Sequence, residues 1–211
     1  MSTATMNTLR LLALALPLAA AITPAHAVKF TFDSDDEGWR ATHGGTQVWH
    51  STGGNSGGWI ETADTDDGDD YVVGAPASAL GNWSHLMGGT LSFDVRNVNG
   101  AAPNWAPFGT VSISGAGRTL SADIVAPDNP PADGLWHTYT ATFNTATWGA
   151  DLPTVLGQVT SFQLKLESHA GASEINGLDN VTFSAAVPEP TSAVLLGLGL
   201  AALAWRRRRA A

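Results

Sequence analysis

Short runs in which apolar and polar residues alternate recur along the middle of the chain. In GTLSFDVRN, residues 89–97, the side chains of Leu91, Phe93 and Val95 fall on one face and polar side chains fall on the other. TSFQLKLES, residues 160–168, repeats this pattern. A period of two is that of a β-strand with one face in the core, so these runs predict half-buried antiparallel strands.

The whole central region follows the same scheme and predicts an all-β fold. Stretches rich in Gly, Pro, Asn and Asp, such as STGGNSGG and VAPDNPPADG, separate the runs and predict turns and loops. We find no internal repeat, and we expect one domain at residues 28–185, a jelly-roll (galactose-binding-like) sandwich of two sheets. The predicted strands are 29–32, 71–73, 90–96, 110–114, 119–125, 137–143, 161–167 and 178–183, and one short helix is predicted at 151–159.

The N-terminus predicts export. Arg10 precedes an apolar run at residues 11–21, and Pro-Ala-His-Ala at 24–27 supplies a cleavage site with small residues. These features are typical of a secretory signal peptide, residues 1–27. A membrane span is the alternative, but the run is shorter than the ~20 residues that a span requires.

Composition narrows the possible partners. The chain has no cysteine, which excludes disulfides and thiolate metal sites. Residues 28–187 contain five Lys and Arg against eighteen Asp and Glu, a net charge of −13. Such a surface repels nucleic acid and anionic membranes, so we expect no nucleic-acid partner and favour cations or neutral glycans.

The C-terminus combines three features in order. A Pro-Glu-Pro triplet is followed by a mostly apolar segment at 191–205 and then by four arginines. As a helix the segment would reach only ~22 Å, so it predicts a short transmembrane helix that spans with local thinning of the bilayer. The arginines would keep its end on the cytoplasmic side. The residues concerned are Pro188, Glu189, Pro190, Arg206, Arg207, Arg208 and Arg209.

This arrangement, at residues 186–211, resembles the PEP-CTERM sorting signal. The resemblance implies recognition by an exosortase, a membrane-embedded sorting protease of Gram-negative bacteria. It further implies membrane anchoring before processing, and then release or transfer to the cell surface in species that make exopolysaccharide. A permanent anchor is the alternative.

A second resemblance covers most of the body, from FDSDDEGWRATHG to GLDNVTF. Pro76, Leu80-Gly81-Asn82 and the strand at 89–93 are similar to the laminin B domain (laminin IV type A), and so is the closing Leu178-Asp179-Asn180-Val181. The resemblance implies a galactose-binding-like jelly roll that serves as an extracellular module, and it brings no catalytic residues.

Acidic clusters suggest calcium. FDSDDEGW places Asp33, Asp35, Glu37 and Gly38 as a calcium loop would, but Gly44 stands where the closing glutamate belongs, which excludes an EF-hand. Six acidic residues between positions 61 and 70 repel one another; they are either a solvated loop or a site for a hard cation.

Resemblance to jelly-roll carbohydrate-binding modules implies a structural calcium between the first and last strands. Here Asp33 and Asp179 would hold it. In the alternative, Asp179 and Asn180 only form a turn or cap at a strand end.

Seven tryptophans lie in the body, and indoles either fill a core or stack on sugar rings. Trp39 and Trp136 lie beside predicted strands, so we expect them in the core. Trp49, Trp83 and Trp105 lie in Gly- or Asn-rich stretches and are candidate ligand contacts.

Catalytic motifs do not emerge. The body's histidines lack the H-E-x-x-H spacing, and G-x-S-x-G is absent, so we expect no enzyme, although a carboxylate pair for glycoside hydrolysis stays open. The function we expect is that of an exported, exosortase-sorted surface or biofilm-matrix protein that binds extracellular polysaccharide. The alternatives are a structural adhesion module that contacts protein, and a glycoside-acting enzyme.

Overall fold

The computed structural model describes residues 27–65, 70–104, 108–125, 129–171, 174–186 and 192–210. The chain divides into two units, and each is described by itself. One is a compact β-structure within residues 25–188. The other contains a single described helix, α3 (Ser192–Ala210).

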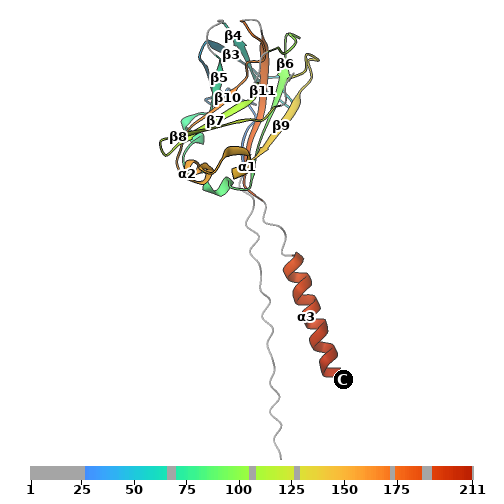
Figure 1. Ribbon diagram of the computed structural model, residues 1–211. Helices are drawn as coiled ribbons and strands as arrows, with labels where there is room; N and C mark the ends of the chain where they lie inside the picture. Colours follow the sequence, from blue (N-terminus) through green and yellow to red (C-terminus); the bar gives the residue numbers. More distant parts are fainter. Residues whose placement is uncertain are drawn as a thin grey trace, which may run out of the picture. The chain divides into compact units, whose positions relative to one another are not determined.

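The compact unit consists of two antiparallel sheets (Figure 1). The larger has the order β3-β4-β11-β6-β9, with β1 also pairing with β11. The smaller has the order β2-β5-β10-β7-β8. The strands of the larger sheet are β1 (Ala27–Phe30), β3 (Gly45–His50), β4 (Trp59–Asp64), β6 (Thr90–Asn97), β9 (His137–Thr142) and β11 (Ile175–Ser184). Those of the smaller are β2 (Arg40–Thr42), β5 (Val72–Gly74), β7 (Thr110–Gly115), β8 (Arg118–Asp123) and β10 (Val159–Lys165).

The core lies between the sheets and is built by the alternation seen in the sequence. Leu91, Phe93 and Val95 of β6 are fully buried from the larger sheet, and Phe162 and Leu164 of β10 are buried from the smaller. Burial of this apolar face is the main force that holds the sheets together. The fold class is confirmed as an all-β two-sheet sandwich.

Trp39 lies at the centre of this core. Its indole is fully buried and meets Phe30, Phe32 and Phe162 edge to face, with ring centroids 5.3, 6.2 and 6.0 Å apart. The prediction that Trp39 is a core residue is therefore confirmed.

Each predicted strand overlaps an observed one, whereas three observed strands, β2, β3 and β4, were not predicted. The predicted short helix corresponds to α2 (Leu152–Leu156), which follows α1 (Thr145–Trp148). Two 3₁₀ turns, η1 (Ala77–Ala79) and η2 (Ser84–Leu86), precede β6.

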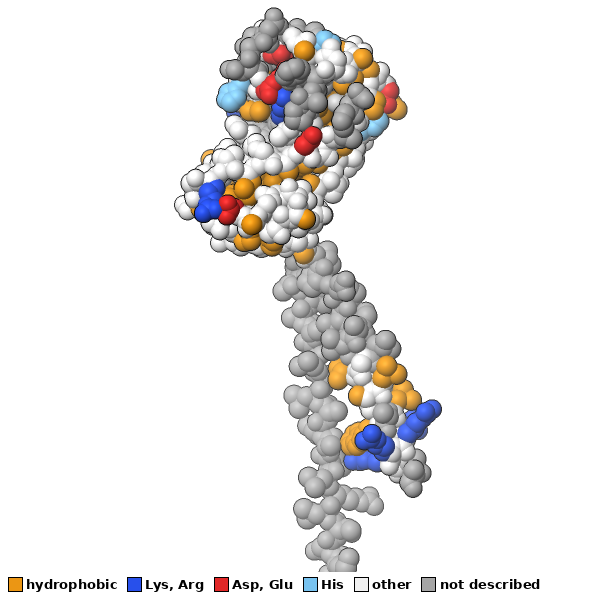
Figure 2. All heavy atoms as spheres, viewed as in Figure 1, with side chains coloured by type: hydrophobic (Ala, Val, Ile, Leu, Met, Phe, Trp, Pro, Cys, Tyr) orange, Lys and Arg blue, Asp and Glu red, His pale blue; other side chains and the backbone are white. Residues whose placement is uncertain are grey.

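Helix α3 carries the apolar segment and then the arginines. Its large side chains Leu198, Leu200, Leu203 and Trp205 are exposed, and its basic side chains gather near its C-terminal end (Figure 2). Within the described residues, no helix combines the length and the apolar character needed to cross a membrane.

Candidate functional site

The outer face of the larger sheet carries a group of aromatic and charged side chains. Ile60 of β4 and Val95 of β6 point into the core and are fully buried. Successive side chains of a strand point to opposite faces, so Trp59, Glu61 and Arg96 lie on the face away from the core.

Gly177 of β11 lies between the two strands that bear these residues. It pairs with Glu61 on one side and with Arg96 on the other. A Cβ atom at this position would lie 2.9 Å from the ring of Trp59 and 2.9 Å from that of Trp136. The absence of a side chain therefore lets both indoles lie over the middle strand.

The rings form one continuous cluster. Trp59 and Trp136 meet edge to face, with centroids 5.7 Å apart and planes at 81°. His50 stacks on Trp59 at 4.4 Å with an interplanar angle of 14°. The guanidinium of Arg96 lies 4.5 Å from the centroid of Trp59 and 4.8 Å from that of Trp136. These are the geometries of stacked, edge-to-face and cation–π contacts. We call these four side chains the aromatic cluster.

The loop at residues 51–58 fixes the cluster in place through its backbone carbonyls. Trp59 Nε1 donates to the carbonyl of Thr52 at 3.0 Å, and Trp136 Nε1 donates to that of Gly53 at 3.3 Å. Arg96 also donates to Gly53, again at 3.3 Å. Rings held in this way lose little entropy when a ligand arrives.

Arg96 keeps hydrogen-bonding capacity. Its Nε is buried and has no hydrogen-bond partner among the described residues. Burial lowers the pKa of the Arg96 guanidinium, an effect that Glu61 partly opposes. Because this N–H is closed to solvent, an acceptor oxygen of a ligand could reach it only after the side chain moved.

The face as a whole suits a neutral ligand with both apolar and hydroxyl surfaces. Trp59 is only 4% exposed and contacts both other rings, whereas Trp136 and His50 are half-buried and keep open surface. Val48, which pairs with Glu61, is 54% exposed on the same face. Aromatic rings can stack on the apolar faces of sugars, and the polar groups beside them can bind hydroxyl groups.

Two carboxylates lie under the 51–58 loop. Asp94 of β6 and Asp179 of β11 are register partners, and both are buried. The backbone N–H of Asn55 donates to Asp179 Oδ2 at 2.8 Å, and its Nδ2 donates to Asp94 Oδ2 at 2.8 Å. Asn180 makes the corresponding bonds at 2.6 and 2.8 Å. Burial, with Asp94 nearby, raises the pKa of Asp179 to about 6.

The predicted calcium ligands Asp33 and Asp179 both contact this loop. Asp33 accepts from the Gly58 N–H at 3.4 Å and from the Thr31 hydroxyl at 2.8 Å. A Cβ atom on Gly57 would lie 1.8 Å from Asp33 Oδ1, so this carboxylate packs directly on the loop backbone. A calcium ion held by Asp33 and Asp179 stays a prediction.

The alternative for Asp179 and Asn180 placed them at a strand end, and this is wrong. Both lie within β11, where the register with β6 shifts between Asp179 and Thr182. Asn180 has φ of 51°, a left-handed conformation that asparagine tolerates. The pair therefore forms a bulge that turns the Asp179 carboxylate toward the loop.

The structure corrects the placement of three tryptophans. Trp83 is a core residue, 5% exposed, packed on Phe183 with ring centroids 4.7 Å apart, so its indole offers no open face. It borders a pocket of about 170 Å³, below the ~300 Å³ at which ligand pockets begin.

Trp49 lies in β3 rather than in a loop, and its Nε1 donates to the Phe32 carbonyl at 2.7 Å. Trp136, expected in the core, is half-buried on the outer face. Trp105 lies outside the described residues.

Among the sorting residues, Arg206, Arg207, Arg208 and Arg209 lie near the end of α3. The Arg209 guanidinium lies 4.0 Å from the centroid of Trp205. Pro188, Glu189 and Pro190 lie outside the described residues.

Comparison with known proteins agrees with this architecture. The described body is a sandwich of two antiparallel sheets with an aromatic cluster on one outer face. The chain belongs to the laminin B (domain IV) family, whose model matches residues 73–196, more than half of the sequence. The PEP-CTERM protein-sorting motif matches residues 186–209. Both predicted resemblances are thus confirmed. A search of curated proteins gives no match.

Solved structures share the fold at low sequence identity. A family 11 carbohydrate-binding module of the cellulase Lic26A-Cel5E of Clostridium thermocellum has a TM-score of 0.50 and 16% identity, over 80% of this chain and 99% of that one. An exo-β-agarase has a TM-score of 0.54 and 13% identity, over 75% of this chain but only 25% of the agarase. At these identities the similarity shows the fold alone.

Proposed function

We propose that this chain is an exported, exosortase-sorted surface protein whose β-sandwich binds extracellular polysaccharide without catalysis. The aromatic cluster of His50, Trp59, Arg96 and Trp136 is the observation that carries the binding role. The organism would be a Gram-negative bacterium that makes exopolysaccharide, and the processed protein would lie at its surface or in its matrix.

The sorting motif supports the first part of the proposal. The motif matches residues 186–209, and within it α3 carries exposed leucines followed by four arginines. The arginines favour a cytoplasmic end, which leaves the sandwich on the outside. A signal peptide at residues 1–27 would begin the same route.

The cluster supports the second part. His50 and Trp136 keep open ring surface. Hydrogen bonds to backbone carbonyls of the 51–58 loop fix the positions of Trp59 and Trp136. The structurally similar carbohydrate-binding module shares this fold. The shared fold is compatible with a sugar site on the sandwich but does not by itself assign one.

The carboxylates of this face are engaged in structural contacts, which supports binding without catalysis. Glu61 Oε2 lies 3.2 Å from His50 Nε2, and Asp94 accepts from Asn55, Asn180 and Thr138. Glycoside hydrolysis needs one carboxyl group free to protonate the leaving oxygen and another facing the sugar.

A depletion assay tests the proposal. Full-length chain, purified in detergent, is mixed with exopolysaccharide from the producing organism, and the unbound protein is measured. We expect wild type to be retained and Trp136→Ala to lose about 10-fold or more in apparent affinity. The comparable stacking of a nucleobase on one aromatic side chain contributes about 1–3 kcal/mol.

Trp49→Phe is the matched control, because it changes a half-buried tryptophan whose indole faces the core side of β3. It should leave retention unchanged. Equal retention of Trp136→Ala and wild type would reject the cluster as the site. Absence of any retention of wild type would favour the protein-contacting adhesion module, and shortening of the polymer on incubation would indicate an enzyme.

A further inference from the structure

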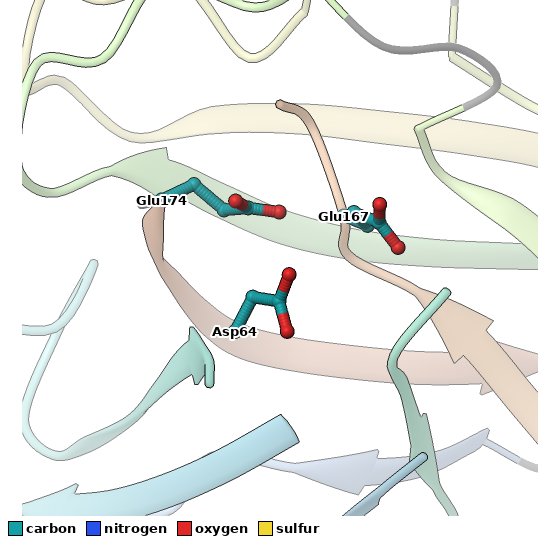
Figure 3. A group of neighbouring side chains, drawn as sticks. All are labelled: Asp64, Glu167 and Glu174. Atoms are coloured by element: carbon teal, nitrogen blue, oxygen red, sulfur yellow. The ribbon is translucent and has the colours of Figure 1, made fainter. Parts of the chain in front are cut away.

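Three acidic side chains that are far apart in the sequence meet at one edge of the sandwich. Asp64 is the last residue of β4, Glu167 follows β10 by two residues, and Glu174 immediately precedes β11. Strands β4 and β11 are neighbours in the larger sheet, whereas β10 belongs to the smaller. Figure 3 shows the three carboxyl groups gathered around a common space. We call them the acidic triad.

The triad is compact and almost closed to solvent. One carboxylate oxygen from each residue lies within 4.8 Å of the others. The exposed fractions are 7% for Asp64, 7% for Glu167 and 1% for Glu174. Asp and Glu are seldom buried so fully unless a partner compensates their charge.

Several buried oxygens at this edge lack a hydrogen-bond donor. Among the described residues, Glu167 Oε2, Glu174 Oε2 and Asn176 Oδ1 have no hydrogen-bond partner. The amide nitrogen of Asn176, by contrast, donates to the Leu166 carbonyl at 2.8 Å and to the Ser168 hydroxyl at 3.1 Å. The amide is therefore oriented by its nitrogen, and its oxygen is an acceptor without a donor. Such buried acceptors are costly unless a hydrogen-bond donor, a water or a cation satisfies them.

Lys165 lies near this charge but is already paired with another carboxylate. Lys165 Nζ is 2.5 Å from Asp70 Oδ2. The positive charge of Lys165 also lowers the pKa of Glu167, against the larger effect of burial. Lys165 is therefore shared between Asp70 and Glu167. Burial is the main cause that raises the pKa of Glu167 to about 7, with Asp70 adding to it, and burial also raises the pKa of Glu174.

We propose that Asp64, Glu167 and Glu174 bind a divalent cation of the calcium class, which joins the two sheets at this edge. The ligands are all oxygens, as hard cations require, and no thiol or imidazole of a zinc site belongs to the group. Calcium accepts an irregular shell of six to eight oxygens, so water can complete the shell beside the three carboxylates. This site is separate from the Asp33 and Asp179 pair and independent of the polysaccharide proposal.

Thermal unfolding of the full-length chain in detergent tests the proposal. At pH 7.5, we expect 1 mM CaCl₂ to raise the Tm of wild type by about 5 °C relative to chelator, because a ligand that binds only the folded state stabilises it. Calorimetry should give binding that Asp64→Asn and Glu167→Gln each weaken by about 10-fold or more. Asp33→Asn should keep the calcium effect.

Two controls keep a folding defect distinct from a lost ligand. Asp123→Asn makes the same chemical change at an exposed residue of β8 and should behave as wild type. In chelator, Glu167→Gln should be at least as stable as wild type at pH 7.5, because it removes a buried repulsive charge. The proposal is overturned if wild type shows no calcium effect, or if the effect survives in Asp64→Asn and Glu167→Gln. Loss in Asp33→Asn alone would assign the ion to the Asp33 and Asp179 pair instead.

Discussion

The indole of Trp136 meets that of Trp59 edge to face across Gly177, with ring centroids 5.7 Å apart. The two tryptophans come from segments 77 positions apart in the sequence, and the strand between them contributes only backbone at this point. The position of both rings therefore depends on a residue that contacts no ligand itself.

The first prediction concerns that residue. In Gly177→Ala, the added Cβ would lie 2.9 Å from each indole, closer than real Cβ atoms approach ring carbons. We expect the rings to shift and polysaccharide retention to fall about 10-fold, with a stability loss of roughly 1–3 kcal/mol from overpacking. Tryptophan fluorescence and the depletion assay measure the two effects.

Gly117→Ala is the control for Gly177→Ala, since nothing lies within 4 Å of a Cβ atom there. Its φ of 73° adds backbone strain in the turn between β7 and β8 of the smaller sheet, so it tests a general loss of stability away from the aromatic cluster. If Gly177→Ala keeps full retention while its fluorescence changes, the position of the two indoles does not determine binding.

The strands in which apolar and polar residues alternate strongly were predicted from the sequence. Strands β2, β3 and β4 were not predicted. Strand β4 has no apolar alternation, because the buried side chains that follow Ile60 are those of Thr62 and Asp64. Its strand character comes from pairing with β3 and β11, which local propensity does not encode.

The candidate site was harder to predict than the fold. Gly177, Arg96 and Trp136 come together only once β11 lies beside β6, and the register that does this is a long-range property. Trp83 shows the converse case: its Gly- and Asn-rich surroundings suggested exposure, but the backbone turns its side chain into the core. Glu167 and Glu174 gave no sequence signal, because their partner Asp64 lies about a hundred positions away.

The second prediction concerns pH. Burial raises the pKa of Asp179 to about 6, from an ordinary value of 3.8, so the folded state binds this proton more tightly than the unfolded state. The stabilising contribution is fully present below about pH 4 and is lost as pH rises through 6. Asp179→Asn cannot ionise, so its unfolding free energy should fall less than that of wild type between pH 4 and 6.

Chemical unfolding in chelator at several pH values measures this slope. The variant also loses one acceptor for the Asn55 and Asn180 N–H groups, which lowers its stability at every pH without changing the slope. Asp123→Asn serves as the exposed control. Identical slopes for Asp179→Asn and wild type would mean that the Asp179 proton does not contribute to stability.

The third prediction follows from the corrected position of Trp83. The centroid of its ring lies 4.7 Å from the ring centroid of Phe183 and 5.9 Å from that of Phe162. Trp83→Ala therefore opens a cavity between the sheets. We expect a loss of about 3–5 kcal/mol in the free energy of unfolding, and unchanged retention by the fraction that stays folded. Lost retention with little loss of stability would instead make Trp83 a ligand contact.

The fourth prediction concerns the arginines at the end of α3. A fourfold variant replaces these arginines with glutamine, at Arg206, Arg207, Arg208 and Arg209. It removes the positive charge that would hold this end of the helix in the cytoplasm. We expect unprocessed chain to accumulate in the cell envelope and the surface fraction to fall severalfold, as measured by fractionation and by the mass of the C-terminal peptide. Arg118→Gln, an exposed change in β8, should be sorted normally. Normal sorting of the fourfold variant would mean that recognition depends on the residues before the helix rather than on its charge.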